Sequence, residues 1–168
     1  MLREIWRNEH PAVHFSDEAH VGFFSQLQED TLNEQNTIEE EFHELGIHSA
    51  EQVQAHMERY CFQTDDLYRP IRQMSGGEKN LLQLAKLAVG NANLLLLDEP
   101  SSHLDVYAQI ALEKALGEYK GAILMVSHDF YSIANCADSI LYVDNGTIRP
   151  MSGRAFRKMI YKNHFSHD

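Results

Sequence analysis

The sequence is poor in cysteine and in long apolar runs, and each shortage excludes a class of protein. Cys61 and Cys136 are the only cysteines among 168 residues, which is too few for a disulfide scaffold and typical of a reducing compartment. No uninterrupted apolar run exceeds six residues, whereas a membrane-spanning helix needs about 20. The first ten residues also lack the apolar core of a signal peptide. These shortages predict a cytosolic chain that does not insert into a membrane.

Basic residues are outnumbered: 14 Lys and Arg face 25 Asp and Glu, for a formal net charge of −11. This balance argues against tight stand-alone nucleic-acid binding, because phosphate neutralisation supplies most of that affinity. Residues 29–58 contain nine acidic and no basic residues, whereas residues 149–162 contain five basic and no acidic ones. We interpret the acidic stretch as a solvated face. The basic stretch fits a solvated amphipathic helix or a contact for nucleic acid.

What the chain does contain is an ordinary globular composition with the pattern of an α/β protein. Short apolar runs with polar ends at residues 92–98 and 121–127 are typical of strands buried on both faces of a parallel sheet. Between them, Val106, Ile110 and other apolar residues recur at helical spacing, which predicts an amphipathic crossover helix over residues 104–119. Strand, helix and strand in this order form a βαβ unit. The fold class is therefore α/β, with a mainly parallel sheet and flanking helices.

Cap and turn signals predict the other elements. In chain order these are a strand at residues 20–25, helices at 38–45 and 50–60 separated by a break at Gly46, and a strand at 139–143 that enters a hairpin at Asn145-Gly146. No internal repeat or low-complexity linker interrupts this series.

A glycine pair at a helix start is the first segment with possible chemistry. Met74-Ser75-Gly76-Gly77-Glu78 precedes a helical run with a leucine-rich face. Ser75 and Glu78 have the S-x-x-E spacing of a capping box, which fixes where the helix begins. Gly76 and Gly77 leave backbone N–H groups uncovered at the positive helix end, where an anion can bind. A well-capped helix without a ligand remains the alternative.

Adjacent carboxylates at a strand end are the second such segment. Asp98 and Glu99 directly follow four leucines, and ligands bind at the carboxyl edge of open α/β sheets. A carboxylate there can hold Mg²⁺, usually through water, and its neighbour can orient an attacking water. A solvated turn with incidental acids is the alternative. The next predicted strand ends near His128, so we expect His128 at the same sheet edge, where it can donate to a phosphate oxygen.

The order of these segments resembles that of ATP-binding-cassette (ABC) ATPases: SGGE, then LLLLDEP, then SSHLD, then VSHD. The form MSGGEKNLLQLAKL with LLLLDEPSSHLD is most similar to the ABC-F group, whose members have two cassettes on one chain and act on ribosomes. Within that group it resembles the antibiotic-resistance, ribosome-protection branch. The resemblance implies a partial P-loop NTPase fold with a helical signature subdomain, and it implies ATP and Mg²⁺ as cofactors.

Carried over by position, the resemblance assigns roles to both segments. The signature motif, which in the family contacts the γ-phosphate of ATP held by the opposite cassette, is matched by Ser75, Gly76, Gly77 and Glu78. Asp98 matches the Walker B aspartate that positions Mg²⁺. Glu99 matches the catalytic glutamate that polarises water.

Three more positions match family motifs around the same nucleotide. His128 matches the catalytic switch histidine. Asp105, together with His103, falls in the D-loop that crosses the dimer interface and is implied to bind nucleotide. The D-loop begins with Ser101-Ser102 where Thr-Asn is commoner. Gln26 resembles the Q-loop glutamine, which is implied to be catalytic and to reach both the metal and the water.

The resemblance treats the whole chain, residues 1–168, as part of one nucleotide-binding domain. It divides the chain into a Q-loop region at 19–36, a helical subdomain ending in the signature helix at 37–90, a core with Walker B, D-loop and switch histidine at 91–148, and a basic tail at 149–168. The implied partner is a second cassette, on the same chain in the parent protein or on another chain, that completes the ATP site. A ribosome is implied through the parent.

The phosphate-binding loop of this family is missing from the sequence. That loop needs G-x-x-x-x-G-K-[ST], whose amides and Lys hold the phosphates, and none of the nine glycines is followed by Lys. Residues 2–5 resemble the tail of the helix that follows the loop, so we expect the chain to be the C-terminal part of a cassette, and of the second one. The sheet should then expose an unpaired edge, which favours marginal stability or association.

Other hypotheses stay open. A transporter cassette would co-purify with a transmembrane partner, although the SGGE-KN signature argues against it. A non-catalytic interaction module would dock through the signature surface and the basic tail, and charge reversal of Arg154, Arg157 and Lys158 would then abolish docking regardless of nucleotide. An ATPase split between two chains, as in chromosome-maintenance heads, would carry its Q-loop on the other half.

We expect the isolated chain to hydrolyse ATP negligibly, because Asp98 and Glu99 have no phosphates held by their own chain to act on. A phosphate-release assay of the purified chain with ATP and Mg²⁺ measures this. Mg²⁺-dependent turnover that Glu99→Gln abolishes would overturn the prediction.

Overall fold

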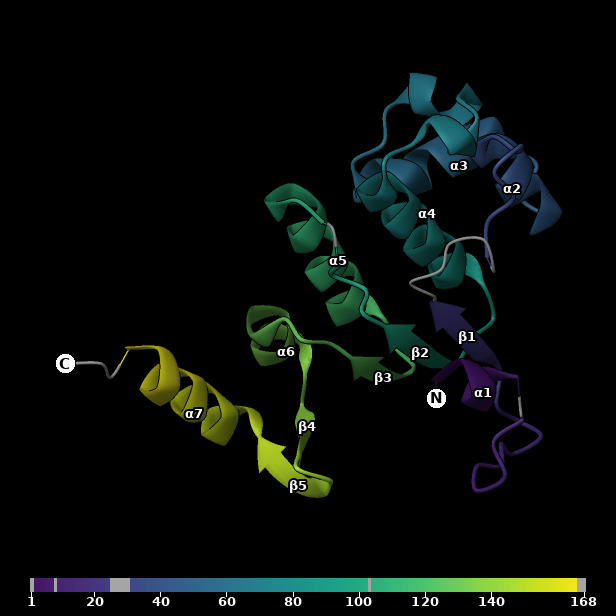
Figure 1. Ribbon diagram of the computed structural model, residues 1–168. Helices are drawn as coiled ribbons and strands as arrows, with labels where there is room; N and C mark the ends of the chain where they lie inside the picture. Colours follow the sequence, from purple (N-terminus) through teal and green to yellow (C-terminus); the bar gives the residue numbers. More distant parts are fainter. Residues whose placement is uncertain (1, 8, 25–30, 103, 166–168) are drawn as a thin grey trace. The chain divides into compact units, whose positions relative to one another are not determined.

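The computed structural model describes residues 2–7, 9–24, 31–102 and 104–165 (Figure 1). The chain divides into two compact units, Met1–Val126 and Ser127–Asp168. Within the described residues, no helix has the length and apolar character needed to cross a bilayer.

A three-stranded parallel sheet forms the centre of the first unit. Its strands, in spatial order, are β1 (Val21–Phe24), β2 (Leu94–Asp98) and β3 (Ala122–Val126). In register, Phe23 lies opposite Leu96, which lies opposite Leu124. Both edges of β2 are paired, so its central leucines are buried. The predicted parallel βαβ arrangement is confirmed, and Asp98 ends the middle strand.

One face of this sheet is covered by α1 (Leu2–Trp6). Leu2 is buried together with Phe23 and Leu96. The rings of Trp6 and Phe23 stack with their centroids 5.0 Å apart. This packing buries Phe23 of β1 and Leu96 of β2 on this side of the sheet.

The other side packs against α4 (Gly76–Val89), which also contacts α5 (Val106–Glu118). Gly22 permits the approach, because a Cβ there would lie 3.0 Å from Leu87 of α4 and 2.8 Å from Leu95. Successive strand residues point to opposite faces, so Gly22 faces α4 while its neighbour faces α1. The buried apolar side chains of α4 are Leu81, Leu82, Leu84 and Ala85.

A group of short helices connects β1 to α4 along the chain (Figure 1). They are α2 (Ile38–Glu44), α3 (Ala50–Met57) and three 3₁₀ helices, η2 (Glu58–Tyr60), η3 (Thr64–Tyr68) and η4 (Ile71–Gln73). Thr37 and Ser49 cap the N-termini of α2 and α3. Gly46 has a φ of +82°, as expected for the predicted break after α2. The apolar core of this region includes Ile38, Phe42, Met57, Leu67 and Ile71.

The second unit is built on an antiparallel hairpin. It contains α6 (Phe130–Cys136), β4 (Ser139–Asp144), β5 (Thr147–Ser152) and α7 (Gly153–Phe165). Asn145 and Gly146 both have positive φ, 47° and 73°, as the predicted two-residue hairpin turn requires. Phe156 of α7 is buried, with its ring centroid 6.0 Å from that of Phe130.

The prediction that β3 is buried on both faces is wrong. Ile123, Leu124 and Val126 are 36%, 44% and 39% exposed. In the sheet of the first unit β3 is the last strand, so one of its edges pairs with no described strand of that sheet. A strand is buried on both faces only where other elements pack against both faces. The apolar composition of β3 alone does not ensure this.

The predicted buried face of α5 is also wrong at two positions. Val106 and Ile110 are 70% and 59% exposed. The buried stripe of the helix instead consists of Ala108, Ala111, Leu112 and Leu116. This stripe has the i, i+3, i+4, i+8 spacing of one helix face. It includes the expected Leu112 and Leu116 but not Val106 and Ile110.

We expect Gly121→Ala to destabilise the fold, because a Cβ at Gly121 would lie 2.6 Å from the backbone oxygen of Asn93 and 2.7 Å from the Tyr119 ring. The free energy of unfolding of the full chain, measured in urea, should fall by about 1–3 kcal/mol. Gly117→Ala in α5 is the control, since nothing lies within 4 Å of its added Cβ, and Ala is up to about 1 kcal/mol better than Gly in a helix. Equal stability of the two variants would contradict the close approach at Gly121.

Candidate functional site

The N-terminus of α4 has the predicted reciprocal capping box. Oγ of Ser75 accepts a hydrogen bond from the Glu78 amide at 3.2 Å, and Oε2 of Glu78 accepts one from the Ser75 amide at 2.7 Å. Ser75 and Gly76 are exposed, and Gly77 is half-buried. The helix therefore begins at the surface with two residues that have no side-chain bulk, a geometry in which an anion can approach the helix end.

Glu78 is also held by a residue outside the helix. Nη2 of Arg69 donates to Oε1 of Glu78. Partial burial alone would raise the pKa of Glu78, but the hydrogen bonds from Ser75 and Arg69 and the charge of Arg69 together outweigh it. The pKa of Glu78 is consequently below its ordinary value of 4.5, and the side chain is ionised at neutral pH.

Asn80 ties α4 to the segment after the paired carboxylates. Its side chain is buried, and its Nδ2 donates to the backbone oxygen of Ser102 at 3.0 Å. Sequence reasoning missed this residue. The available signal was a polar side chain immediately before the apolar run of the helix.

The paired carboxylates lie at the carboxyl end of β2, as expected. Asp98 is the last residue of the strand, and Glu99 follows with a left-handed φ of +50°. That conformation costs a non-glycine residue about 1–2 kcal/mol. The Glu99 amide is fixed by donating to the backbone oxygen of Val126 at 2.9 Å. Residues held in such backbone conformations cluster at functional sites, which is consistent with the role expected of Glu99.

Asp105 has a structural contact in addition to its expected role in the D-loop. Its Oδ1 accepts a hydrogen bond from the Ala108 amide at 2.8 Å and so caps α5. The side chain is otherwise exposed. Nucleotide binding by Asp105 stays a prediction.

Of the remaining predicted residues, one belongs to the second unit and two lie outside the described residues. His128 is exposed and belongs to the second unit, directly before Asp129, which caps α6. Its expected place at the sheet edge of the two acids stays a prediction. Gln26 and His103 lie outside the described residues.

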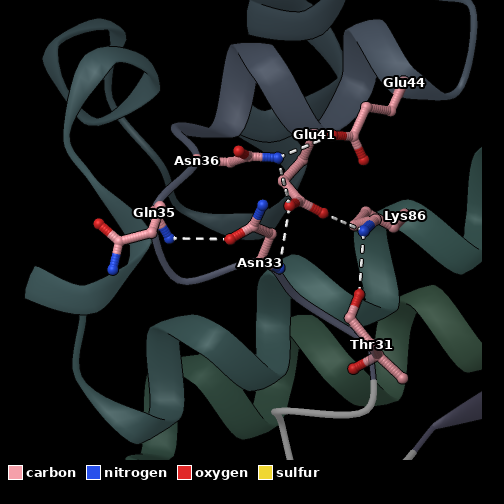
Figure 2. Close-up of polar contacts among 7 residues, drawn as sticks. All are labelled: Thr31, Asn33, Gln35, Asn36, Glu41, Glu44 and Lys86. Atoms are coloured by element: carbon pink, nitrogen blue, oxygen red, sulfur yellow. Dashed lines mark hydrogen bonds and ion pairs between the residues drawn. The ribbon is translucent and has the colours of Figure 1, made fainter.

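A buried ion pair links α4 to the segment that follows β1 (Figure 2). Nζ of Lys86 pairs with Oε2 of Glu41 in α2 and donates to the backbone oxygen of Thr31 at 3.0 Å. Oε1 of Glu41 accepts from the Asn33 amide and from Nδ2 of Asn36, both at 3.0 Å. The network holds residues 31–36 against α2 and α4.

Glu41 corrects the interpretation of residues 29–58 as a solvated face. It is 1% exposed, whereas Glu44 and Glu51 are exposed as expected. A carboxylate can be buried here because a cation and two N–H donors satisfy it. The sequence contained one sign of this pair, because Lys86 interrupts the apolar face of α4.

Comparison with known proteins first gives the class. The model of the ABC transporter family matches residues 4–102, so the chain belongs to this family. An archaeal ribosome recycling factor, solved in complex with an archaeal ribosomal stalk protein, has a similar fold, with a TM-score of 0.69 at 21% identity over 96% of this chain and 34% of that chain. A dimeric ATP-binding cassette in a post-hydrolysis state, bound to ADP and Pi, gives 0.62 at 22% identity over 81% and 64%. The predicted ABC ATPase fold is confirmed.

The curated relatives then narrow the group. YdiF of Bacillus subtilis is 33% identical over 152 residues, 90% of this chain and 24% of YdiF. ABC transporter F family member 2 of Arabidopsis thaliana is 34% identical over 132 residues, 78% of this chain and 20% of that protein. YheS of Escherichia coli is 34% identical over 134 residues, 79% and 21%. The predicted resemblance to the ABC-F group is confirmed, and the chain spans 20–24% of these relatives' length.

The described residues fit ATP and Mg²⁺ only as part of a shared site. Asp98 offers one carboxylate, and protein Mg²⁺ sites of this kind combine one or two carboxylates with substrate phosphates and waters. No group of three His, Cys, Asp or Glu side chains in the described part of the chain could hold a metal ion. A metal ion at Asp98 would be held by that carboxylate together with waters and substrate phosphates.

We expect Lys86→Met to lower the free energy of unfolding by about 3 kcal/mol, because it leaves the buried Glu41 carboxylate without its cation. Urea denaturation of the full chain measures this. Arg59→Gln is the control, since it breaks the Arg59–Glu118 pair, whose side chains are 54% and 46% exposed, and should cost no more than about 1 kcal/mol. Equal losses for the two variants would show that burial does not distinguish the pairs.

Proposed function

We propose that this chain forms the signature-bearing part of an ABC-F ATPase. Its Ser75–Glu78 segment binds the γ-phosphate of an ATP molecule held by a second cassette. The observation that carries the proposal is the start of α4, a capped and exposed helix N-terminus with two glycines in its first turn. Membership of the ABC transporter family supports it, as does the general affinity of helix N-termini for phosphate.

In the complete protein, we assign the hydrolytic roles to Asp98 and Glu99 at the end of β2. Asp98 positions Mg²⁺ through water, and Glu99 polarises the attacking water. His128 donates to the γ-phosphate, Gln26 reaches the metal and the water, and Asp105 contributes to nucleotide binding from the D-loop. When bound, ATP with Mg²⁺ supplies the phosphoryl group and neutralises its charge. The left-handed backbone of Glu99 supports its assignment.

We further propose that the parent protein binds and hydrolyses ATP in order to act on the ribosome, in the cytoplasm. The relatives named as ABC transporter F family members support this, and the form of the motifs favours the antibiotic-resistance, ribosome-protection branch over a translation factor. On α7, Arg154 and Lys158 are exposed and can contact RNA phosphates.

Ser75→Asp tests the proposed γ-phosphate site without removing the helix cap. Aspartate caps a helix as well as serine, but it adds a negative charge where the phosphate binds. The partner is a cassette of YdiF chosen by locating a G-x-x-x-x-G-K-[ST] loop in its sequence, with the glutamate that aligns with Glu99 changed to Gln. We expect the unmodified chain to associate with it only when ATP and Mg²⁺ are present, as measured by sedimentation, and Ser75→Asp to abolish association.

Ser49→Asp is the matched control, because Ser49 caps α3 by the same kind of hydrogen bond. It should leave association within about twofold of the unmodified chain. Nucleotide-independent association, or equal effects of the two substitutions, would contradict the proposed site.

A further inference from the structure

The proposed phosphate site contains a negative charge of its own. Glu78 is the third residue of α4 and is ionised. The N-terminus of a helix attracts anions through its dipole, and a carboxylate in the first turn weakens that attraction for any second anion. A helix start that keeps Glu78 and binds phosphate needs that charge to be offset.

Arg69 is placed to offset it. It follows η3 in the chain, and its Nη2 donates to Oε1 of Glu78, the oxygen that does not accept the Ser75 amide. The Arg69 and Glu78 side chains are only 30% and 35% exposed, so solvent ions screen the pair less than they screen a free surface pair. Arg69 therefore compensates the charge while leaving the capping oxygen of Glu78 in place.

The neighbouring charges do not replace Arg69. Lys79, the next residue of α4, pairs with Glu34 at 2.5 Å. Asp66 also contacts Nη2 of Arg69, at 3.2 Å. Its Oδ2 accepts from the Gln63 amide at 2.8 Å. Arg69 is thus shared by two carboxylates, and removing it changes the formal charge of the group Asp66, Arg69 and Glu78 from −1 to −2. Among the ion pairs of the described residues, Glu78 takes part in the one with Arg69.

We propose that Arg69 is a positioning residue of the shared ATP site, and that it neutralises Glu78 so that the start of α4 stays attractive to the γ-phosphate. The inference rests on the proposed function and deepens it. Arg69 acts through Glu78 and does not itself touch the nucleotide. The charge-neutral substitution of Glu78 should therefore remove the need for Arg69.

A double-mutant cycle on the full chain tests this, with the ATP-loaded YdiF cassette as the partner and the dissociation constant as the readout. Arg69→Gln should weaken association roughly three- to tenfold, the range expected for one uncompensated charge near the surface. Glu78→Gln serves as the background of the cycle: it removes the charge that Arg69 compensates, and Gln can still take its place in the capping box. In the Glu78→Gln background, Arg69→Gln should change the constant by less than about twofold. A loss of threefold or more in that background would overturn the proposal.

Two controls separate charge from structure. Arg69→Lys keeps the positive charge and should retain most of the affinity. Arg59→Gln removes a cation from the ion pair with Glu118 and should leave the affinity unchanged. The comparison in the Glu78→Gln background decides the question even if the single variant Arg69→Gln does not fold.

The outcomes also distinguish this proposal from the proposed function. If the unmodified chain does not associate with the ATP-loaded cassette, the proposed function is contradicted and the role of Arg69 with it. If the unmodified chain associates but Glu78→Gln does not rescue Arg69→Gln, only the role of Arg69 is contradicted.

Discussion

The reciprocal hydrogen bonds between Ser75 and Glu78 fix the first turn of α4, and the first unit is arranged around that helix. α4 contacts β1, α3 and α5. The cap fixes where this helix begins, and the buried face that follows packs in the core. The proposed phosphate site therefore lies at the end of a helix that is anchored in the core.

Three positions along α4 relate it to the segments with expected chemistry. Its first turn contains the signature residues. Asn80, one turn further, holds the backbone of Ser102, shortly after the paired carboxylates. Lys86, in the last turn, holds Glu41 and the backbone of Thr31, just after the segment that contains Gln26. The same helix thus contains the signature residues and contacts the chain near the paired carboxylates and near the segment that follows β1.

The features that could be predicted from the sequence are those with local causes. The capping box at Ser75 is set by residues three positions apart, the hairpin by Asn145-Gly146, and β2 by an unbroken run of leucines between polar ends. Within the site, the cap and the order of Asp98 and Glu99 at a strand end could be read directly. Each depends on a few neighbouring residues and on sheet topology.

The features that could not be predicted depend on which distant segments meet. Glu41 and Lys86 are 45 positions apart, and nothing in an acidic stretch marks which carboxylate is buried. Arg69 and Glu78 are nine positions apart, in different elements, and no spacing rule within one helix pairs them. The exposure of β3 and of Val106 likewise depends on which elements pack against them, and their apolar composition does not show this.

The central claim, that the start of α4 faces an ATP molecule held by another cassette, is tested most directly by hydrogen exchange. Exchange is measured by mass spectrometry on the full chain, alone and with the ATP-loaded cassette. The claim predicts slower exchange at the amides of Gly76 and Gly77 and unchanged exchange in α3. Association of the two proteins with unchanged exchange at Gly76 and Gly77 would contradict it.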